Sequence, residues 1–209
     1  MGRAKAAAQT TFSVDESIFR SISDVEEPQG ILAIGEGPRW NWLQIFQKSP
    51  APVLVLEGLQ NPGNLASIIR TAEAAGAAGV ITTPGTARLN SPKALRGAMG
   101  STLRFPAIEH VPVPDIIERL TGAGCMLYGT LVDRDQHLPA SVTYTGIDWT
   151  QASAIVLGKE GGGISDTWTK SLQQTITIPM QSPVESLNVA AAAAILLYEA
   201  LRQRTENVK

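Results

Sequence analysis

The fold is decided by residues 52–82, which read PVLVLEGLQNPGNLASIIRTAEAAGAAGVIT. The stretch begins with four consecutive apolar residues, 53–56, a pattern typical of a strand that is buried on both faces. After a glycine-bounded turn, apolar residues recur at helical spacing and predict an amphipathic helix over 64–76. A second apolar run, 79–82, predicts the next strand. Strand, helix and strand in this order indicate two neighbouring parallel strands.

The same alternation continues to the end of the chain, and it predicts an α/β fold. Strands that alternate with helices form a mostly parallel sheet with helices on both faces. The expected strands are 105–108, 125–132, 154–157 and 175–178, and the expected helices are 91–99, 114–120, 165–172 and 188–204.

The beginning of the chain reads differently. It offers one short apolar run, 31–34, and a short helical pattern in Trp42, Ile45 and Phe46. We therefore expect residues 1–48 to be an N-terminal extension or linker and residues 49–209 to form the main domain.

Composition narrows the class of protein. With 44% apolar and 17% charged residues, the chain reads as an ordinary soluble globular protein. Its longest apolar run, 189–198, is too short to span a bilayer. The single cysteine, Cys125, precludes an internal disulfide and favours a reducing, cytoplasmic location. A net charge of −2 is unlike that of a self-sufficient nucleic-acid binder, so a polyanion would bind at a local patch.

Several common site chemistries are not supported. His110 and His137 are far apart and only one cysteine is available, so we expect no metal site. The glycine-rich residues 158–163 match neither a P-loop nor a dinucleotide-binding fingerprint. Residues 163–167 lack the final glycine of a nucleophile elbow. The acids of residues 133–135 are expected in a solvated loop.

Three segments at expected strand ends, where α/β sheets place their ligands, carry a stronger signal. They are residues 56–73 (LEGLQNPGNLASIIRTAE), 155–165 (IVLGKEGGGIS) and 178–190 (IPMQSPVESLNVA). Each also has a purely structural explanation. Asn64 could cap a helix and Arg70 could pair with Glu73, while the glycines could form a simple turn.

In this order and spacing, the three segments together resemble the motifs of the SpoU/TrmH branch of the SPOUT RNA methyltransferases. The resemblance covers residues 52–201. It implies a C-terminal deep trefoil knot that binds S-adenosyl-L-methionine between the second and third segments. It also implies that residues 1–48 are the remnant of an RNA-binding domain. A homodimer with a shared active site is implied too, although the alanines at 190–194 are equally compatible with packing inside one chain.

The resemblance also assigns the site residues by position. Glycine would let the backbone approach the cofactor closely, and apolar side chains would form a slot for the purine. The cofactor-binding residues are then Thr130, Leu131, Leu157, Gly158, Glu160, Gly161, Ile178, Met180, Ser186, Leu187 and Asn188. The catalytic residues are Asn64, Arg70, Glu160, Ser186 and Asn188.

The expected reaction is methyl transfer from S-adenosyl-L-methionine to a ribose 2′-hydroxyl of structured RNA, with rRNA favoured over tRNA. Two alternatives stay open, a non-catalytic RNA-binding module of the same fold and a SPOUT methyltransferase that acts on a base. Whether Arg70 acts as a base or positions a phosphate or oxyanion is also open. Neither a metal nor a membrane partner is expected.

Overall fold

The computed structural model describes residues 8–23, 25–130, 141–159 and 161–206, and the chain divides into two compact units, Met1–Glu36 and Gly37–Lys209. The described part of the smaller unit holds one helix, α2 (Glu16–Ile22). The strand predicted at 31–34 is wrong: these residues are irregular, with Ile34 95% exposed. A short apolar run needs a neighbouring strand and a covering layer to become a strand, and here its side chains have neither.

The larger unit is built on a seven-stranded sheet in the order β3-β2-β1-β6-β4-β7-β5, and the neighbouring strands in it pair in parallel. The strands are β1 (Val53–Leu56), β2 (Gly79–Thr82), β3 (Ala107–Ile108), β4 (Met126–Thr130), β5 (Ser141–Thr143), β6 (Ser153–Leu157) and β7 (Gln174–Thr177). The helices are α3 (Trp42–Phe46), α4 (Pro62–Ala74), α5 (Pro92–Gly97), α6 (Ser101–Arg104), α7 (Val113–Gly122), the 3-10 helix η1 (Tyr144–Gly146), α8 (Asp166–Thr169) and α9 (Val189–Glu206).

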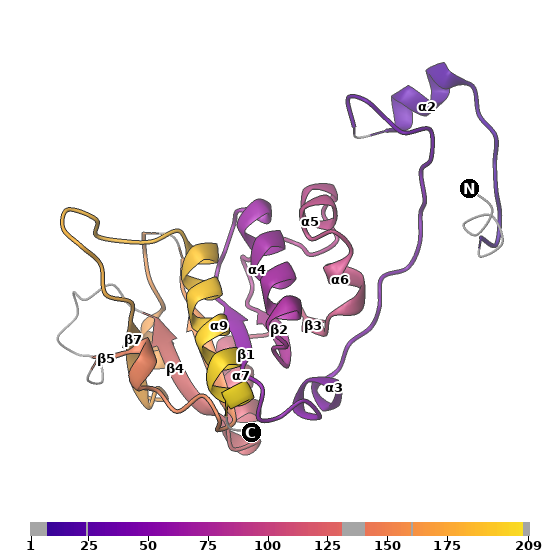
Figure 1. The fold of residues 1–209 in the computed structure, drawn as a ribbon. Helices are drawn as coiled ribbons and strands as arrows, with labels where there is room; N and C mark the ends of the chain where they lie inside the picture. The colour runs from indigo at the N-terminus through magenta and orange to yellow at the C-terminus, as the bar shows by residue number, and fades with distance from the viewer. Residues whose placement is uncertain (1–7, 24, 131–140, 160, 207–209) are drawn as a thin grey trace. The chain divides into compact units, whose positions relative to one another are not determined.

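Helices cover both faces of this sheet, as expected. Leu54 and Leu56 of β1 pack with α4 and α9 in one apolar cluster, whereas Val53 and Val55 pack with α3, α7 and α8 in the other. Successive strand residues point to opposite faces, so a run of four apolar residues serves both clusters. Figure 1 shows α4 and α9 side by side on one face.

Most expected elements of the larger unit are confirmed to within a few residues. Three short elements, β5, α6 and η1, were not expected, because none has enough residues to show a period. The helix α3 belongs to the larger unit, where Ile45 is fully buried. Among the residues with described coordinates, no helix is long and apolar enough to cross a membrane.

Candidate active site

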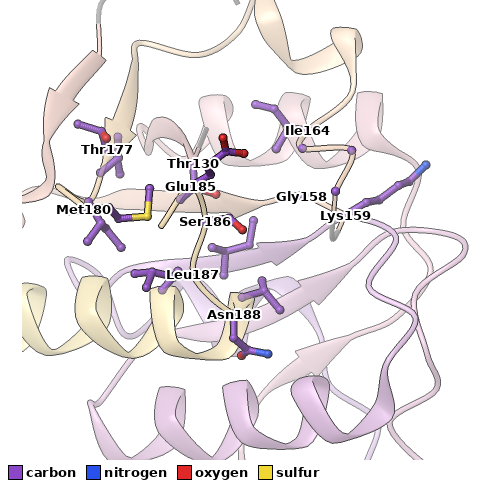
Figure 2. A pocket seen from close by; sticks show the side chains of 18 of the residues that line it. Thr130, Gly158, Lys159, Ile164, Thr177, Met180, Glu185, Ser186, Leu187 and Asn188 are labelled. Carbon is purple, nitrogen blue, oxygen red and sulfur yellow. The ribbon is translucent and has the colours of Figure 1, made fainter. Parts of the chain in front are cut away.

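A large cavity lies at the carboxyl ends of β4, β6 and β7, beside the first residues of α4 and α9. Its volume is about 1400 Å³. Small-molecule pockets usually measure about 300–1,000 Å³, so this one has room for more than one small ligand. Figure 2 shows Gly158 and Lys159 across the pocket from Met180. Four charged side chains, two of each sign, line its described part: Lys159, Asp166, Lys170 and Glu185.

The glycine-rich loop after β6 forms one wall. Lys159 and Gly163 close it with two backbone hydrogen bonds, at 2.9 and 3.1 Å between N and O. Gly161 and Gly163 have φ of +77° and +63°, in the left-handed region that glycine tolerates. A side chain on Gly158 would overlap backbone atoms of Gly163 and Ile164. Glycine at 158 is therefore required by the loop itself, whether or not a ligand is bound.

A buried carboxylate at the end of β1 holds the far end of this loop. Glu57 is 6% exposed, and its oxygens accept hydrogen bonds from the Ser165 backbone N–H at 2.8 Å and from Ser165 Oγ at 2.6 Å. The sequence analysis missed this role. The available signal was an acidic residue directly after a fully buried strand, because buried acids are usually paired or hydrogen-bonded.

The residue that caps α4 is Asn61, and not Asn64 as the simple structural explanation would have it. Asn61 caps the helix, accepting from the N–H groups of Gly63 and Asn64, and Pro62 occupies its first turn. Proline suits this position because the missing N–H would have no helical partner there. With Asn61 as the cap, Asn64 lies inside the first turn and lines the cavity.

The third segment connects the cavity to α9. Asn188 Nδ2 donates to Asn64 Oδ1 at 3.2 Å, and Asn188 Oδ1 accepts from the Ala190 N–H at 2.9 Å. Asn188 thus lies directly before α9, and its side chain links the third segment to the first by a hydrogen bond. Thr130, at the end of β4, donates from Oγ1 to the Val156 carbonyl at 3.0 Å.

Arg70 lies apart from the cavity. Its side chain is exposed and is not among the cavity-lining residues. Glu73, its candidate ion-pair partner, instead accepts from Arg104 Nε and Nη2 at 3.1 and 3.0 Å. Hydrogen bonds from Ser101 and then Arg104 lower the pKa of Glu73. The structural explanation of Arg70 as the partner of Glu73 is therefore wrong.

The structure brings most of the predicted site residues together. Leu131 and Glu160 lie outside the described residues, and Arg70 is not at the cavity. The predicted residues that line the cavity are Asn64, Thr130, Leu157, Gly158, Gly161, Ile178, Met180, Ser186, Leu187 and Asn188. Within the described ranges, no group of three or more His, Cys, Asp or Glu residues could hold a metal ion.

Comparison with known proteins identifies the family. Residues 51–198 match the model of the SpoU rRNA Methylase family. The chain belongs to the SpoU rRNA methylase family. Methyltransferases of this family use S-adenosyl-L-methionine, so the expected enzyme class and methyl donor are confirmed at the level of the family.

The relatives include proteins whose names state an activity. The chain is 33% identical over 187 residues to the 23S rRNA (guanosine(2553)-2'-O)-methyltransferase RlmP of Bacillus subtilis, covering 90% of this chain and 71% of that protein. An AdoMet-bound rRNA methyltransferase from Sinorhizobium meliloti is 29% identical with a TM-score of 0.79, over 90% of this chain and 70% of that one. The SpoU methyltransferase AviRb from Streptomyces viridochromogenes, in complex with AdoMet, is 32% identical with a TM-score of 0.66. That match covers 74% of this chain and 60% of AviRb.

The cavity of this SpoU-family chain fits such a cofactor. Ile178, Met180 and Leu187 provide apolar surface for a purine ring, and none of the three is fully buried by the chain itself. The glycine loop presents backbone N–H and C=O groups without covering side chains, which suits close contact with a ribose.

Proposed function

We propose that this chain transfers the methyl group of S-adenosyl-L-methionine to a ribose 2′-hydroxyl of structured RNA, with rRNA preferred over tRNA. The observation that carries the proposal is the Asn188–Asn64 hydrogen bond, which joins the cofactor-side segment to the first turn of α4 in one cavity. The similarity to RlmP, named a 2'-O-methyltransferase, supports ribose rather than base as the acceptor. An RNA substrate of this kind favours a cytoplasmic enzyme.

The cofactor would lie between the glycine loop and the third segment, and it supplies an electrophilic methyl group. Leu157, Gly158 and Gly161 would contact it from one side, and Ile178, Met180 and Leu187 from the other. Ser186 and Asn188 would orient its polar groups. Because the transfer requires the oxygen, the methyl carbon and the sulfur in line, positioning supplies a large part of the rate enhancement.

Arg70 would act on the RNA rather than on the cofactor. Arginine is always protonated near neutral pH, so it is a poor general base. Its planar fork can hold a phosphate or a developing alkoxide by two hydrogen bonds. Arg70 lies away from the cavity of its own chain. We therefore propose that it either holds RNA that extends from Arg70 into this cavity, or contacts the reacting ribose in the cavity of a second protomer.

We further propose a homodimer formed through α9. Ala193, in the middle of the alanines at 190–194, is fully buried in the core of its own chain. The exposed side of α9 instead carries Ala191 and the 52% exposed Tyr198, seven residues apart and therefore on one face. Tyr198→Glu is expected to give the mass of one chain in light scattering, whereas the wild type gives two. A wild-type mass of one chain would exclude the dimer.

The knot and the domain boundary also remain proposals. In the sheet, β7 lies between β4 and β5, which follow each other in the chain. This order supports the proposal of a C-terminal trefoil knot. We propose residues 49–209 as the catalytic domain and residues 1–48 as an extension related to a substrate-binding domain, with α3 of this extension packed on the catalytic domain.

The decisive test is the identity of the methylated nucleoside. Purified protein is incubated with labelled S-adenosyl-L-methionine and unmodified rRNA transcript, and the digested RNA is analysed by mass spectrometry. We expect a 2′-O-methyl nucleoside. A base-methylated nucleoside would indicate the alternative enzyme. RNA binding without methylation under all substrate conditions would indicate a non-catalytic module.

Arg70→Ala is expected to lower single-turnover methylation by on the order of 10², the scale for loss of one transition-state donor. Binding of S-adenosyl-L-methionine should stay within a few-fold, and Arg70→Lys should rescue poorly because the fork geometry is lost. Arg119→Ala, on α7, is the matched control. Near-normal turnover of Arg70→Ala would remove Arg70 from the catalytic residues.

A further inference from the structure

Positive charge is concentrated in one part of this acidic chain. Residues 58–108 contain five cations and a single acid, Glu73, so the segment carries +4, while the remaining residues together carry −6. The cations are Arg70, Arg88, Lys93, Arg96 and Arg104. The net charge of −2 therefore conceals a strong local asymmetry, and a polyanion is attracted to one region and repelled by the rest.

Packing places this region beside the cavity. The helix α5 lies against α4, and Figure 1 shows the two helices next to each other. They approach closely at Gly97 and Ala66, because a side chain on Gly97 would come within 2.8 Å of the Ala66 Cβ. Ala66 follows the cavity-lining Asn64 by two residues, so the contact with α5 lies within one turn of the cavity.

The same side of α4 continues toward α6. Residues three to four apart lie on one face of a helix, so Ala66, Arg70 and Glu73 form a row. The row begins at the contact with α5 and ends at the ion pair between Glu73 and Arg104 of α6. Arg70 is therefore positioned between the two ends of this row, on the side that faces α5 and α6.

Three cations next to this row are available to an outside partner. Arg88, Lys93 and Arg96 are exposed, and Lys93 and Arg96 are spaced to lie on one side of α5. Within the described parts of the chain, no acidic side chain pairs with any of the three. Arg104, in contrast, is held by Glu73. We name Arg88, Lys93 and Arg96 the α5 basic surface.

We propose that the α5 basic surface binds backbone phosphates of the RNA strand next to the nucleotide that enters the cavity. The inference rests on the proposed function and adds the path of the substrate. A nucleic-acid backbone fits better than a protein partner, because the three exposed cations form no ion pair with a described acid and phosphate contacts need no particular base sequence. The neighbouring Glu109 carboxylate instead accepts a hydrogen bond from the Leu89 N–H at 2.8 Å. RNA held there would run across α5 toward the start of α4, where Asn64 lines the cavity.

The test is the salt dependence of RNA binding. A fluorescein-labelled 20-nucleotide RNA hairpin is titrated with the full chain between 50 and 300 mM KCl, and anisotropy gives the dissociation constant. Each phosphate contact contributes a slope of about −0.7 to −0.9 in log K against log salt. The triple variant Arg88→Gln/Lys93→Gln/Arg96→Gln should flatten the slope by about 2 and weaken binding about 10- to 100-fold at 0.1 M.

The matched control is Arg119→Gln, an exposed arginine on α7, which packs on the other face of the sheet. It removes one positive charge, as each substitution of the triple variant does, and is expected to leave the wild-type slope unchanged. Binding of S-adenosyl-L-methionine should be unchanged in the triple variant, because none of the three residues lines the cavity. That measurement also shows that the variant is folded.

The outcomes separate this inference from the proposed function. A triple variant with the wild-type slope, in a protein that still methylates RNA, overturns the α5 basic surface alone. A loss of slope per removed charge that is as large in Arg119→Gln as in the triple variant overturns it too, because the attraction would then depend on total charge. If the wild-type chain neither methylates rRNA nor binds the hairpin, the proposed function itself fails.

Discussion

Replacing Glu57 with alanine tests whether the carboxylate at the end of β1 holds the glycine loop in position. Glu57 accepts two hydrogen bonds from Ser165, and it is buried. A hydrogen bond to a charged group contributes about 1.5–3 kcal/mol to stability, so the two bonds contribute about 3–6 kcal/mol if their effects add. The variant also removes a buried charge, which offsets part of this loss. We expect the free energy of unfolding to fall by about 2–4 kcal/mol.

Ser165→Ala separates the two bonds. It removes the hydroxyl contact and leaves the backbone N–H bonded to Glu57. We expect a loss of about 1.5–3 kcal/mol, smaller than that of Glu57→Ala. In the Ser165→Ala background, Glu57→Ala should cost less than it does in the wild type. The difference measures the coupling between the two side chains.

Urea denaturation gives these free energies, and calorimetric titration gives the affinity for S-adenosyl-L-methionine. Because the glycine loop lines the cavity, a loop released from Glu57 should bind at least tenfold more weakly, equivalent to about 1.4 kcal/mol. Glu57→Ala with the stability and affinity of the wild type would refute the anchoring role. Additive effects of the two substitutions would show that the hydroxyl contact contributes nothing.

Three further outcomes are expected. Gly158→Ala should weaken binding of S-adenosyl-L-methionine at least tenfold, because the added Cβ would overlap the backbone of the glycine loop, while circular dichroism shows a retained fold. Gly162→Ala is the control, since its Cβ would meet only an ordinary contact at 3.7 Å. Hydrogen bonds from Arg202 lower the pKa of Glu199, so the stability it adds is present above pH 4.5 and is lost at lower pH. The melting temperatures of wild type and Glu199→Gln should thus differ at pH 7 and converge as the pH is lowered below 4.5. Burial raises the pKa of the Cys125 thiol, so a thiol reagent should modify it at pH 8 only after unfolding in urea.

The parts of the fold that were predictable are those with a long apolar pattern. The run of four apolar residues in β1 has to be buried on both sides, and this property alone indicates a central strand covered by two layers. The three residues of β5 carry no such pattern, and their place is fixed by pairing with β7. The run at 31–34 shows the reverse case, since its apolar residues resemble a strand but find no partner in the described structure.

The site was predictable where backbone and chain order determine it. Parallel strands bring their carboxyl ends to one edge, so the segments after β6 and β7 had to meet there. Contacts that depend on single side chains were not predictable. The pairing of Glu57 with Ser165 joins residues 108 positions apart, and the pairing of Glu73 with Arg104 replaces the nearer partner that helical spacing offers.

Helical geometry also explains why Asn64 and Arg70 do not share one cavity. Six residues of an α-helix turn by about 600°, so the two side chains point about 120° apart and lie about 9 Å apart along the axis. Because the Asn64 side chain lines the cavity, Arg70 has to point away from the cavity. It then lies on the side of α4 that meets α5 and α6, where Glu73 pairs with Arg104. Rotating α4 to bring Arg70 to the cavity would expose the buried Ile68 and Ile69. The two residues can act on one nucleotide only if the RNA spans both faces of α4, or if a second copy of the chain supplies one of them.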